Sequence, residues 1–212
     1  MLTSDYSDFA KNRLMGNFDE MGSWRLVAPY LINKKTLDIG CADGLYLRYL
    51  NKDSVGIEQI PELAAAARVR GLNVISEDIV NSLEKIQNNE FEAVLYSHVM
   101  EHIDSPISSL RQIYRILSSK GILVLGLPTE NNIYRNLLRK DYFDGTHIYS
   151  FSVRNAIKLL DESGFETDRV LYHLPKCRSQ IGSHIQRLWN SLLLPFHEYF
   201  SMAYWIIAVK RG

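Results

Sequence analysis

Residues 37–49 read LDIGCADGLYLRY, and this stretch decides the fold. A short apolar strand enters a turn that contains Gly40 and Gly44, and the residues after the turn favour a helix. Such a unit brings backbone N–H groups close to a ligand at the carboxyl edge of a parallel sheet. A dinucleotide fingerprint would need glycines where Ala42 and Leu45 stand, and no GK[ST] phosphate-binding motif occurs. The stretch therefore predicts a ligand without a diphosphate.

Acidic residues fall where three successive predicted strands meet that edge. Asp38 lies inside the first strand, Glu58 ends the second, and Asp78 follows the third, with Ile79 beside it. A carboxylate at the end of the second strand can accept hydrogen bonds from both hydroxyls of a ribose. An acid with an apolar neighbour suits the exocyclic amine and the face of adenine. Together these positions predict an adenosine-type ligand.

The rest of the chain alternates short apolar runs with helical patterns. Each run is β-branched or aliphatic and is bounded by turn residues, as expected for strands buried on both faces. This alternation predicts an α/β fold with a mostly parallel sheet and helices on both faces. The last strand arrives after a long connection and is expected to be antiparallel. The predicted strands are 36–40, 55–58, 74–77, 91–98, 122–127, 170–174 and 205–210.

Helix signals lie between these strands. Helices are predicted to begin at Pro61, at Pro106 with Ser105 as its cap, and after Ser152, the last of them closing at Gly164. In the helix from Pro106 the predicted apolar stripe is Ile107, Leu110, Tyr114 and Leu117. The N-terminal ~30 residues are predicted to be helical and to pack over the first strand. Their predicted apolar face is Trp24, Val27, Tyr30 and Leu31.

Composition limits the class of protein. The chain has 212 residues, 46% of them hydrophobic, which suits one domain with a sizeable core. Its 24 basic and 24 acidic residues cancel, which disfavours a dedicated nucleic-acid binder. Cys41 and Cys177 form no disulfide framework or zinc motif. No apolar run approaches the ~20 residues of a membrane span, and no signal peptide is recognisable, so a cytoplasmic location is expected.

The neutral total hides two unlike halves. Residues 1–106 carry 10 basic and 16 acidic side chains, a net charge of −6. Residues 107–212 carry 14 basic and 8 acidic side chains, a net charge of +6. The acidic half suits a cationic ligand with a ribose, and the basic half favours an acceptor that bears a carboxylate or phosphate.

The motifs, taken in order, resemble those of class I S-adenosylmethionine-dependent methyltransferases. The resemblance rests on DIGCADG at 38–44, Glu58, the EDI at 77–79 and the strand with Glu-His at 94–103, and it extends over roughly 36–164. The segment 145–166 is similar to quinone-biosynthesis and polysaccharide-associated members, and the segment 56–79 is similar to methionine-biosynthesis-associated methyltransferase-like proteins. The resemblance implies one Rossmann-like, seven-stranded domain. Within it, 1–33 would form an N-terminal helical cap, 36–128 the cofactor-binding half, and 129–212 the acceptor-side half and last strands.

The resemblance also implies roles for particular residues. S-adenosylmethionine is the expected cofactor, with S-adenosylhomocysteine as the product. Asp38, Gly40 and Gly44 would line its methionine portion, together with Ser97 and His98, and Cys41 lies within the same turn. Glu58 would hold the ribose, Gln59 and Ile60 would lie beside the adenine, and Asp78 and Ile79 would contact its amine and ring. Ala42 departs from the glycine usual in the family and would narrow the approach of the cofactor.

Methyl transfer to a hydroxyl requires a base for its proton. His102 is the first candidate, after Glu101 on the rim where the family places its acceptor, and His147 is the second. Each has an equally weighted alternative: His102 could bond backbone at the start of a helix, and His147 could pack beside Tyr149. The similar quinone-biosynthesis members carry further carboxylates before the Glu-His pair that are thought to hold a metal. Because His98 stands at such a position here, the resemblance implies no metal. Cys41 is interpreted as a buried filler and not as a nucleophile.

The expected partner is a small-molecule acceptor methylated at oxygen, with no nucleic acid and no transmembrane segment. Two interpretations of the C-terminal stretch are open. It could cover the sheet edge or form a homodimer contact. Alternatively, its aromatic residues could touch a membrane that carries a lipid-linked acceptor. A basic-aromatic cluster at 134–142 could bind an anionic acceptor. The main alternative function is a methyltransferase-like partner or regulatory protein with little catalysis. An NAD-dependent oxidoreductase is disfavoured by Ala42 and Leu45.

Overall fold

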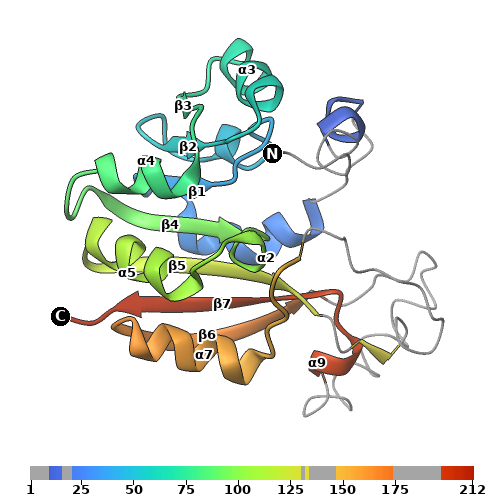
Figure 1. The fold of residues 1–212 in the computed structure, drawn as a ribbon, viewed down its shortest axis with the longest axis vertical. Coiled ribbons are helices and arrows are strands. Elements are labelled where there is room, and N and C mark those ends of the chain that lie inside the picture. Colours follow the sequence, from blue (N-terminus) through green and yellow to red (C-terminus); the bar gives the residue numbers. More distant parts are fainter. Residues whose placement is uncertain (1–9, 16–20, 130–131, 134–146, 174–196) are drawn as a thin grey trace.

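The computed structural model describes residues 10–15, 21–129, 132–133, 147–173 and 197–212. Its strands form one seven-stranded sheet in the order β3-β2-β1-β4-β5-β7-β6 (Figure 1). The strands are β1 Thr36–Ile39, β2 Val55–Ile57, β3 Val74–Ile75, β4 Phe91–Ser97, β5 Leu117–Pro128, β6 Phe165–His173 and β7 Ala203–Lys210.

The direction of the strands follows the predicted pattern. Strands β1 to β5 pair in parallel, whereas β7 lies antiparallel between β5 and β6. The chain leaves β1 toward β2 and β3 on one side and returns to β4 on the other side. In open α/β sheets such a reversal of strand order places the ligand site at the carboxyl ends of the strands. The predicted fold class, a mostly parallel sheet with an antiparallel last strand, is confirmed.

Three strands begin earlier than predicted: β7 by two residues, and β5 and β6 by five residues each. Strand β5 begins at Leu117, directly after the preceding helix, because its polar residues 118–120 continue the strand beyond its apolar part. Strand β6 begins at Phe165, and its residues 166–169 are mostly exposed. An edge strand with one solvated face carries polar residues, so apolar runs alone do not reveal it.

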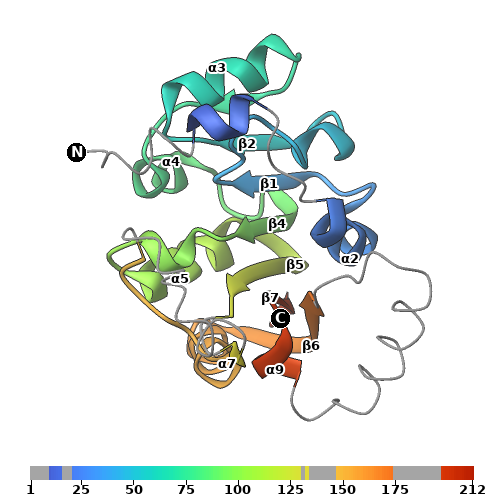
Figure 2. The same ribbon diagram turned by 90° about the vertical axis from the view of Figure 1, so that its right-hand side faces the viewer.

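Helices cover both faces of the sheet, as predicted (Figure 2). One face carries α4 Ile79–Lys85, α5 Pro106–Ile116 and α7 Val153–Glu162, and the other carries α2 Met21–Leu31. Helix α3, Pro61–Val69, packs through Ala64 and Ala67 beside the glycine turn and β3. The short helix α9, His197–Phe200, precedes β7. No helix in the described part of the chain is long and apolar enough to cross a membrane.

The N-terminal helix packs elsewhere than predicted. Trp24, Val27 and Leu31 of α2 are buried, and Tyr30 is half-buried, so the apolar face is as expected. The helix covers the middle of the sheet and not the first strand. Its partners there are Ala93 and Leu95 of β4, Val124 of β5, and Trp205 and Ile207 of β7. These residues form one buried apolar cluster with the helix, and burial of apolar surface drives such packing.

Helix details differ in part. Ser152 caps α7 by accepting the Asn155 N–H at 3.2 Å, whereas the Ser105 side chain makes no capping bond to α5. In α5 only Leu110 of the predicted stripe is fully buried within the helix, and Leu117 already belongs to β5. The buried stripe is Pro106, Ser109, Leu110, Ile113 and Ile116, which is the face that meets the sheet.

The helix predicted after the glycine turn is reduced to one 3₁₀ turn, η1 Leu47–Tyr49. Only ten residues separate Gly44 from β2, and part of that length is used to reverse the chain direction. The N–H groups of Gly40 and Cys41 donate to the Ile57 carbonyl and that of Gly44 to the Cys41 carbonyl, so backbone bonds close the turn without a long helix behind it. The helix predicted near 183–194, the basic-aromatic cluster at 134–142, Cys177 and the apolar C-terminal residues up to Phe196 lie outside the described residues.

Candidate active site

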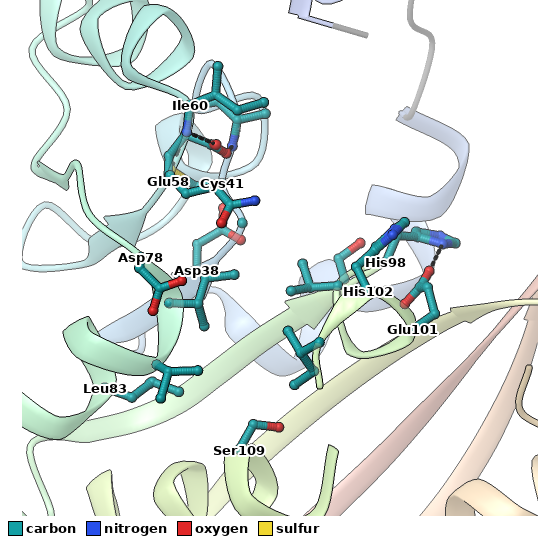
Figure 3. Close-up of a pocket in the computed structure, with 18 of the residues that line it drawn as sticks. Asp38, Cys41, Glu58, Ile60, Asp78, Leu83, His98, Glu101, His102 and Ser109 are labelled. Atoms are coloured by element: carbon teal, nitrogen blue, oxygen red, sulfur yellow. Dashed lines mark hydrogen bonds and ion pairs between the residues drawn. The ribbon is translucent and has the colours of Figure 1, made fainter. Parts of the chain in front are cut away.

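A cavity of about 770 Å³ opens at the carboxyl ends of β1, β2 and β4 and extends to the start of α5 (Figure 3). It contains Asp38, Glu58 and Asp78 toward one end and His98, Glu101 and His102 toward the other. The structure brings together all but one of the residues predicted for the cofactor and for catalysis. Those that line the cavity are Asp38, Gly40, Cys41, Glu58, Gln59, Ile60, Asp78, Ile79, Ser97, His98, His102 and His147.

Gly44 is the predicted site residue outside this lining. Its φ is +80°, and a methyl group there would run into the Leu72 side chain and lie 3.4 Å from Cβ of Ala67. Glycine adopts positive φ without steric cost. Gly44 therefore shapes the turn and permits its close packing against α3.

Glu58 ends β2 as a buried carboxylate held by the backbone of two neighbouring segments. Its Oε2 accepts the Ala42 N–H at 2.9 Å, and its Oε1 accepts the Ile60 N–H at 2.7 Å. Burial raises the pKa of Glu58, and the backbone bonds and the charge of Arg13 oppose this rise. Each carboxylate oxygen has a second lone pair. The group is thus fixed in orientation and can still accept two further hydrogen bonds, as two adjacent ribose hydroxyls require.

The turn between β1 and η1 is conformationally demanding. Gly40 has φ +73°, and its N–H and that of Cys41 both donate to the Ile57 carbonyl at 2.9 and 3.0 Å. Ala42 has φ +51°, a left-handed conformation that L-residues other than glycine rarely adopt. The Ala42 N–H donates to the buried Glu58 carboxylate, and this bond compensates the unusual backbone conformation. Ala42 therefore affects the backbone conformation of the turn, in addition to the expected narrowing of the cofactor's approach.

Asp78 and Cys41 have well-defined structural surroundings. Asp78 is the N-cap of α4 and accepts the Asn81 N–H at 3.1 Å, while Ile79 is buried as the first helical residue. Cys41 is buried, and burial together with Asp38 and Glu58 raises the pKa of its thiol far above the usual range. A protonated thiol is a poor nucleophile. Its environment agrees with the interpretation of Cys41 as a filler.

Arg13 is a cavity residue that the sequence did not indicate. It comes from the helical segment 10–14, and its Nε donates to Oδ1 of Asp43 at 2.8 Å. Asp43 also pairs with Arg70. Burial alone would raise the pKa of Asp43, but the hydrogen bonds and charges of the two guanidinium groups outweigh burial and hold that pKa below its usual value. This triad fastens the N-terminal segment to the glycine turn.

At the other end of the cavity, three imidazoles surround Glu101. His98 has φ +52°, an uncommon backbone conformation of the kind found at functional sites, and its Nδ1 lies 3.6 Å from Oε1 of Glu101. The rings of His102 and His147 meet edge to face with centroids 4.7 Å apart. Glu101, His102 and His147 could together hold a metal ion, since one ligand atom from each lies within 4.8 Å of the others.

The strand order and the cavity at the switch point define a Rossmann-like α/β protein that binds its ligand at the carboxyl ends of the strands. Residues 12–170 match the methyltransferase domain family. The chain therefore belongs to that family, as its motifs suggested, and S-adenosylmethionine is the cofactor that family and fold imply. The buried, oriented carboxylate of Glu58 in a cavity of nucleoside size fits that cofactor.

Curated relatives are distant and differ in function. A tRNA U34 carboxymethyltransferase from Helicobacter pylori (strain HPAG1) is 26% identical over 180 residues, or 77% of this chain and 69% of that protein. A ubiquinone biosynthesis O-methyltransferase from Xanthomonas campestris pv. campestris (strain B100) is 30% identical over 99 residues, or 43% of this chain and 41% of that protein. For the first relatives matched, the chain spans between 41% and 69% of their length.

A solved structure supports the fold. A Thermotoga maritima methyltransferase, described as a possible histamine N-methyltransferase, superposes with a TM-score of 0.71. The alignment covers 97% of this chain and 96% of that one at 20% identity.

Proposed function

We propose that the protein transfers a methyl group from S-adenosylmethionine to an oxygen of a small-molecule acceptor. The observation that carries the proposal is the arrangement of one continuous cavity, with a backbone-anchored carboxylate at one end and imidazoles at the other. A nucleoside bound at Glu58 would direct its sulfonium toward the imidazole end. Because methyl transfer is an in-line displacement, positioning the acceptor there and excluding water would supply most of the catalysis.

In this proposal the cofactor occupies the Glu58 end of the cavity. Glu58 accepts hydrogen bonds from the ribose hydroxyls, while Gln59 and Ile60 lie along the adenine. Asp78 and Ile79 face the adenine amine and ring. The methionine portion lies along the turn and the end of β4, against Asp38, Gly40, Cys41, Ser97 and His98, with Gly44 supporting the turn from behind.

The acceptor occupies the imidazole end, where His102 and His147 are the proposed catalytic residues. In the reaction the acceptor oxygen forms a bond to the methyl carbon as the sulfur–carbon bond breaks. The electron pair of that bond goes to sulfur, which gives neutral S-adenosylhomocysteine. The hydroxyl proton must leave, and as free bases His102 and His147 would take it up.

The charge of the second half of the chain bears on the nature of the acceptor. The net charge of +6 over residues 107–212 favours an anionic acceptor. A lipid-linked small molecule is also included in the proposal. We place the whole chain in one domain, with the cap, cofactor-binding and acceptor-side segments at 1–33, 36–128 and 129–212. We further propose a cytoplasmic location and allow for a homodimer through the C-terminal stretch.

RNA is the competing acceptor. It is suggested by the tRNA-modifying relative, which matches 77% of the chain, whereas the zero net charge favours a small molecule. A methyltransferase-like regulatory protein that binds the cofactor without turnover is the alternative of a different class. Incubation with radiolabelled S-adenosylmethionine and either total tRNA or a small-molecule extract separates these. Label in the small-molecule fraction supports the proposal, and label in tRNA alone would overturn the choice of acceptor.

Cofactor binding is tested by thermal shift with S-adenosylmethionine, S-adenosylhomocysteine, NAD and ATP. A ligand at 100 times its Kd stabilises the folded state by about 2.7 kcal/mol, which raises the Tm by several degrees. We expect such a rise with the two sulfur-containing ligands only. A rise in Tm with NAD and none with S-adenosylhomocysteine would refute the assignment of S-adenosylmethionine as the cofactor.

A further inference from the structure

The side chain of Glu101 is buried without a hydrogen-bond partner. It is 1% exposed, and among the described residues neither carboxylate oxygen has a donor within bonding geometry. His98 Nδ1 lies 3.6 Å from Oε1, beyond hydrogen-bond distance. A buried carboxylate is costly unless a cation or donors face it. Glu101 lines the cavity, so a cation that entered the cavity could reach it.

Backbone bonds fix two imidazoles beside this carboxylate. The N–H groups of Ile148 and Tyr149 donate to the Glu101 carbonyl at 2.8 and 3.1 Å, which places His147 directly against the loop after β4. The Tyr149 hydroxyl donates to the Asp104 carbonyl at 2.9 Å and closes the same junction. His102 follows Glu101 in the chain and meets His147 edge to face. The arrangement is thus built by two segments about 45 residues apart in the sequence.

The geometry points to a divalent metal site formed by Glu101, His102 and His147. One carboxylate oxygen and two imidazole nitrogens form a set that suits Zn²⁺ and related first-row ions. Their atoms lie within 4.8 Å of one another. Ligand atoms around an ion with bonds of about 2.1 Å lie roughly 3–4 Å apart, so small side-chain rotations complete the set. The prediction that no metal binds considered only the residues before Glu101. The fold adds a third ligand, His147, from a different segment of the chain.

The role of the ion rests on the proposed function, although its binding does not. With three protein ligands, the ion keeps open positions toward the cavity. An oxygen of the acceptor bound there would have its hydroxyl pKa lowered, and its proton would pass to water before the oxygen attacks the methyl carbon. The imidazoles would then act as ligands and not as free bases. The imidazole of His98, 3.6 Å from the Glu101 carboxylate, would orient this ligand.

The test is a titration of the EDTA-treated full-length protein with Zn²⁺ and with Co²⁺. We expect one equivalent to bind with a Kd in the micromolar range or below, and Co²⁺ to give visible absorption bands that report nitrogen and oxygen ligands. Glu101→Gln and His147→Ala should each weaken binding at least tenfold. His147 is partly exposed, so we expect the variant to remain folded. His197→Ala, outside the cavity lining, is the matched control and should leave the Kd unchanged.

Two results would overturn the site: no saturable binding, or binding that persists unchanged in Glu101→Gln and His147→Ala. If metal fails to bind while Glu101→Gln shifts the pH dependence of stability, a protonated imidazole is the partner of Glu101 and the metal inference is wrong. The S-adenosylhomocysteine thermal shift is independent of these outcomes. A protein that binds metal but not this nucleoside would refute the proposed function alone.

Discussion

The carboxylate of Glu58 accepts the backbone N–H of Ala42 at 2.9 Å, across the turn that joins β1 to η1. This bond links the residue that departs from the family pattern to the residue proposed to hold the ribose. It also explains how alanine is accommodated at φ +51°, since the left-handed conformation directs its N–H at the carboxylate. The predictions below begin from this pair.

Glu58→Ala should abolish the stabilisation by S-adenosylhomocysteine. The change removes two charge-assisted hydrogen bonds to the ribose, each contributing about 1.5–3 kcal/mol, so affinity should fall by at least 100-fold. Isothermal titration calorimetry measures this. Glu62→Ala removes an exposed acid from the first turn of α3 and should bind normally. Unchanged affinity in Glu58→Ala would place the ribose elsewhere.

Ala42→Gly should stabilise the protein and preserve binding. Relief of the left-handed conformation is worth about 1 kcal/mol, partly offset by the entropy of glycine in the unfolded chain. Urea denaturation would show the gain. Asn33→Gly, at φ +67° away from the cavity, should gain less because asparagine tolerates this region. A loss of cofactor affinity in Ala42→Gly would mean that the methyl group itself contacts the cofactor.

Gly44→Ala should destabilise the fold while leaving cofactor affinity within about threefold. The added methyl group meets Leu72 at a positive φ, so a cost of about 1–3 kcal/mol is expected. Gly71→Ala is the matched control: its φ is +79°, but no atom lies within 4 Å of the added group. It should show only the backbone cost, about 1 kcal/mol. Equal losses in the two variants would contradict the packing role of Gly44.

Asp43→Asn should lower stability at neutral pH by about 2 kcal/mol and flatten the acid limb of the stability curve. The pKa of Asp43 is depressed in the folded state, so its stabilisation is present above the unfolded pKa of about 3.9 and is lost as pH falls through the folded pKa. Chemical denaturation at pH values from about 3 to about 7, the range over which carboxyl groups titrate, measures the free energy of unfolding as a function of pH. Asp53→Asn, an exposed control, should retain the wild-type curve.

His102→Ala should remove turnover and retain the S-adenosylhomocysteine shift. Loss of a proton acceptor or of a metal ligand reduces kcat by about 100-fold or more. His147→Ala should likewise lower kcat and retain the S-adenosylhomocysteine shift. Full activity in both variants would exclude them from catalysis, whereas loss of the thermal shift would assign them to cofactor binding.

From the sequence alone followed the α/β class, the approximate positions of strands β1 to β5 and the acidic positions along the carboxyl edge, and the family resemblance of its motifs implied the cofactor. This was possible because these features depend on local periodicity, turn chemistry and short motifs. Even there, the edge strand β6 was too polar to be read in full, and the segment after the turn closed into a single 3₁₀ turn.

Only the tertiary structure decided which distant groups meet. Arg13 reaches Asp43 across 30 residues, α2 covers the middle of the sheet, and the backbone at Ile148 and Tyr149 bonds to Glu101 and brings His147 beside His102. These contacts depend on which apolar faces bury each other and on where buried charges find partners. Both are properties of the packed chain, because a buried group is stabilised by whatever surrounds it in space, irrespective of sequence separation.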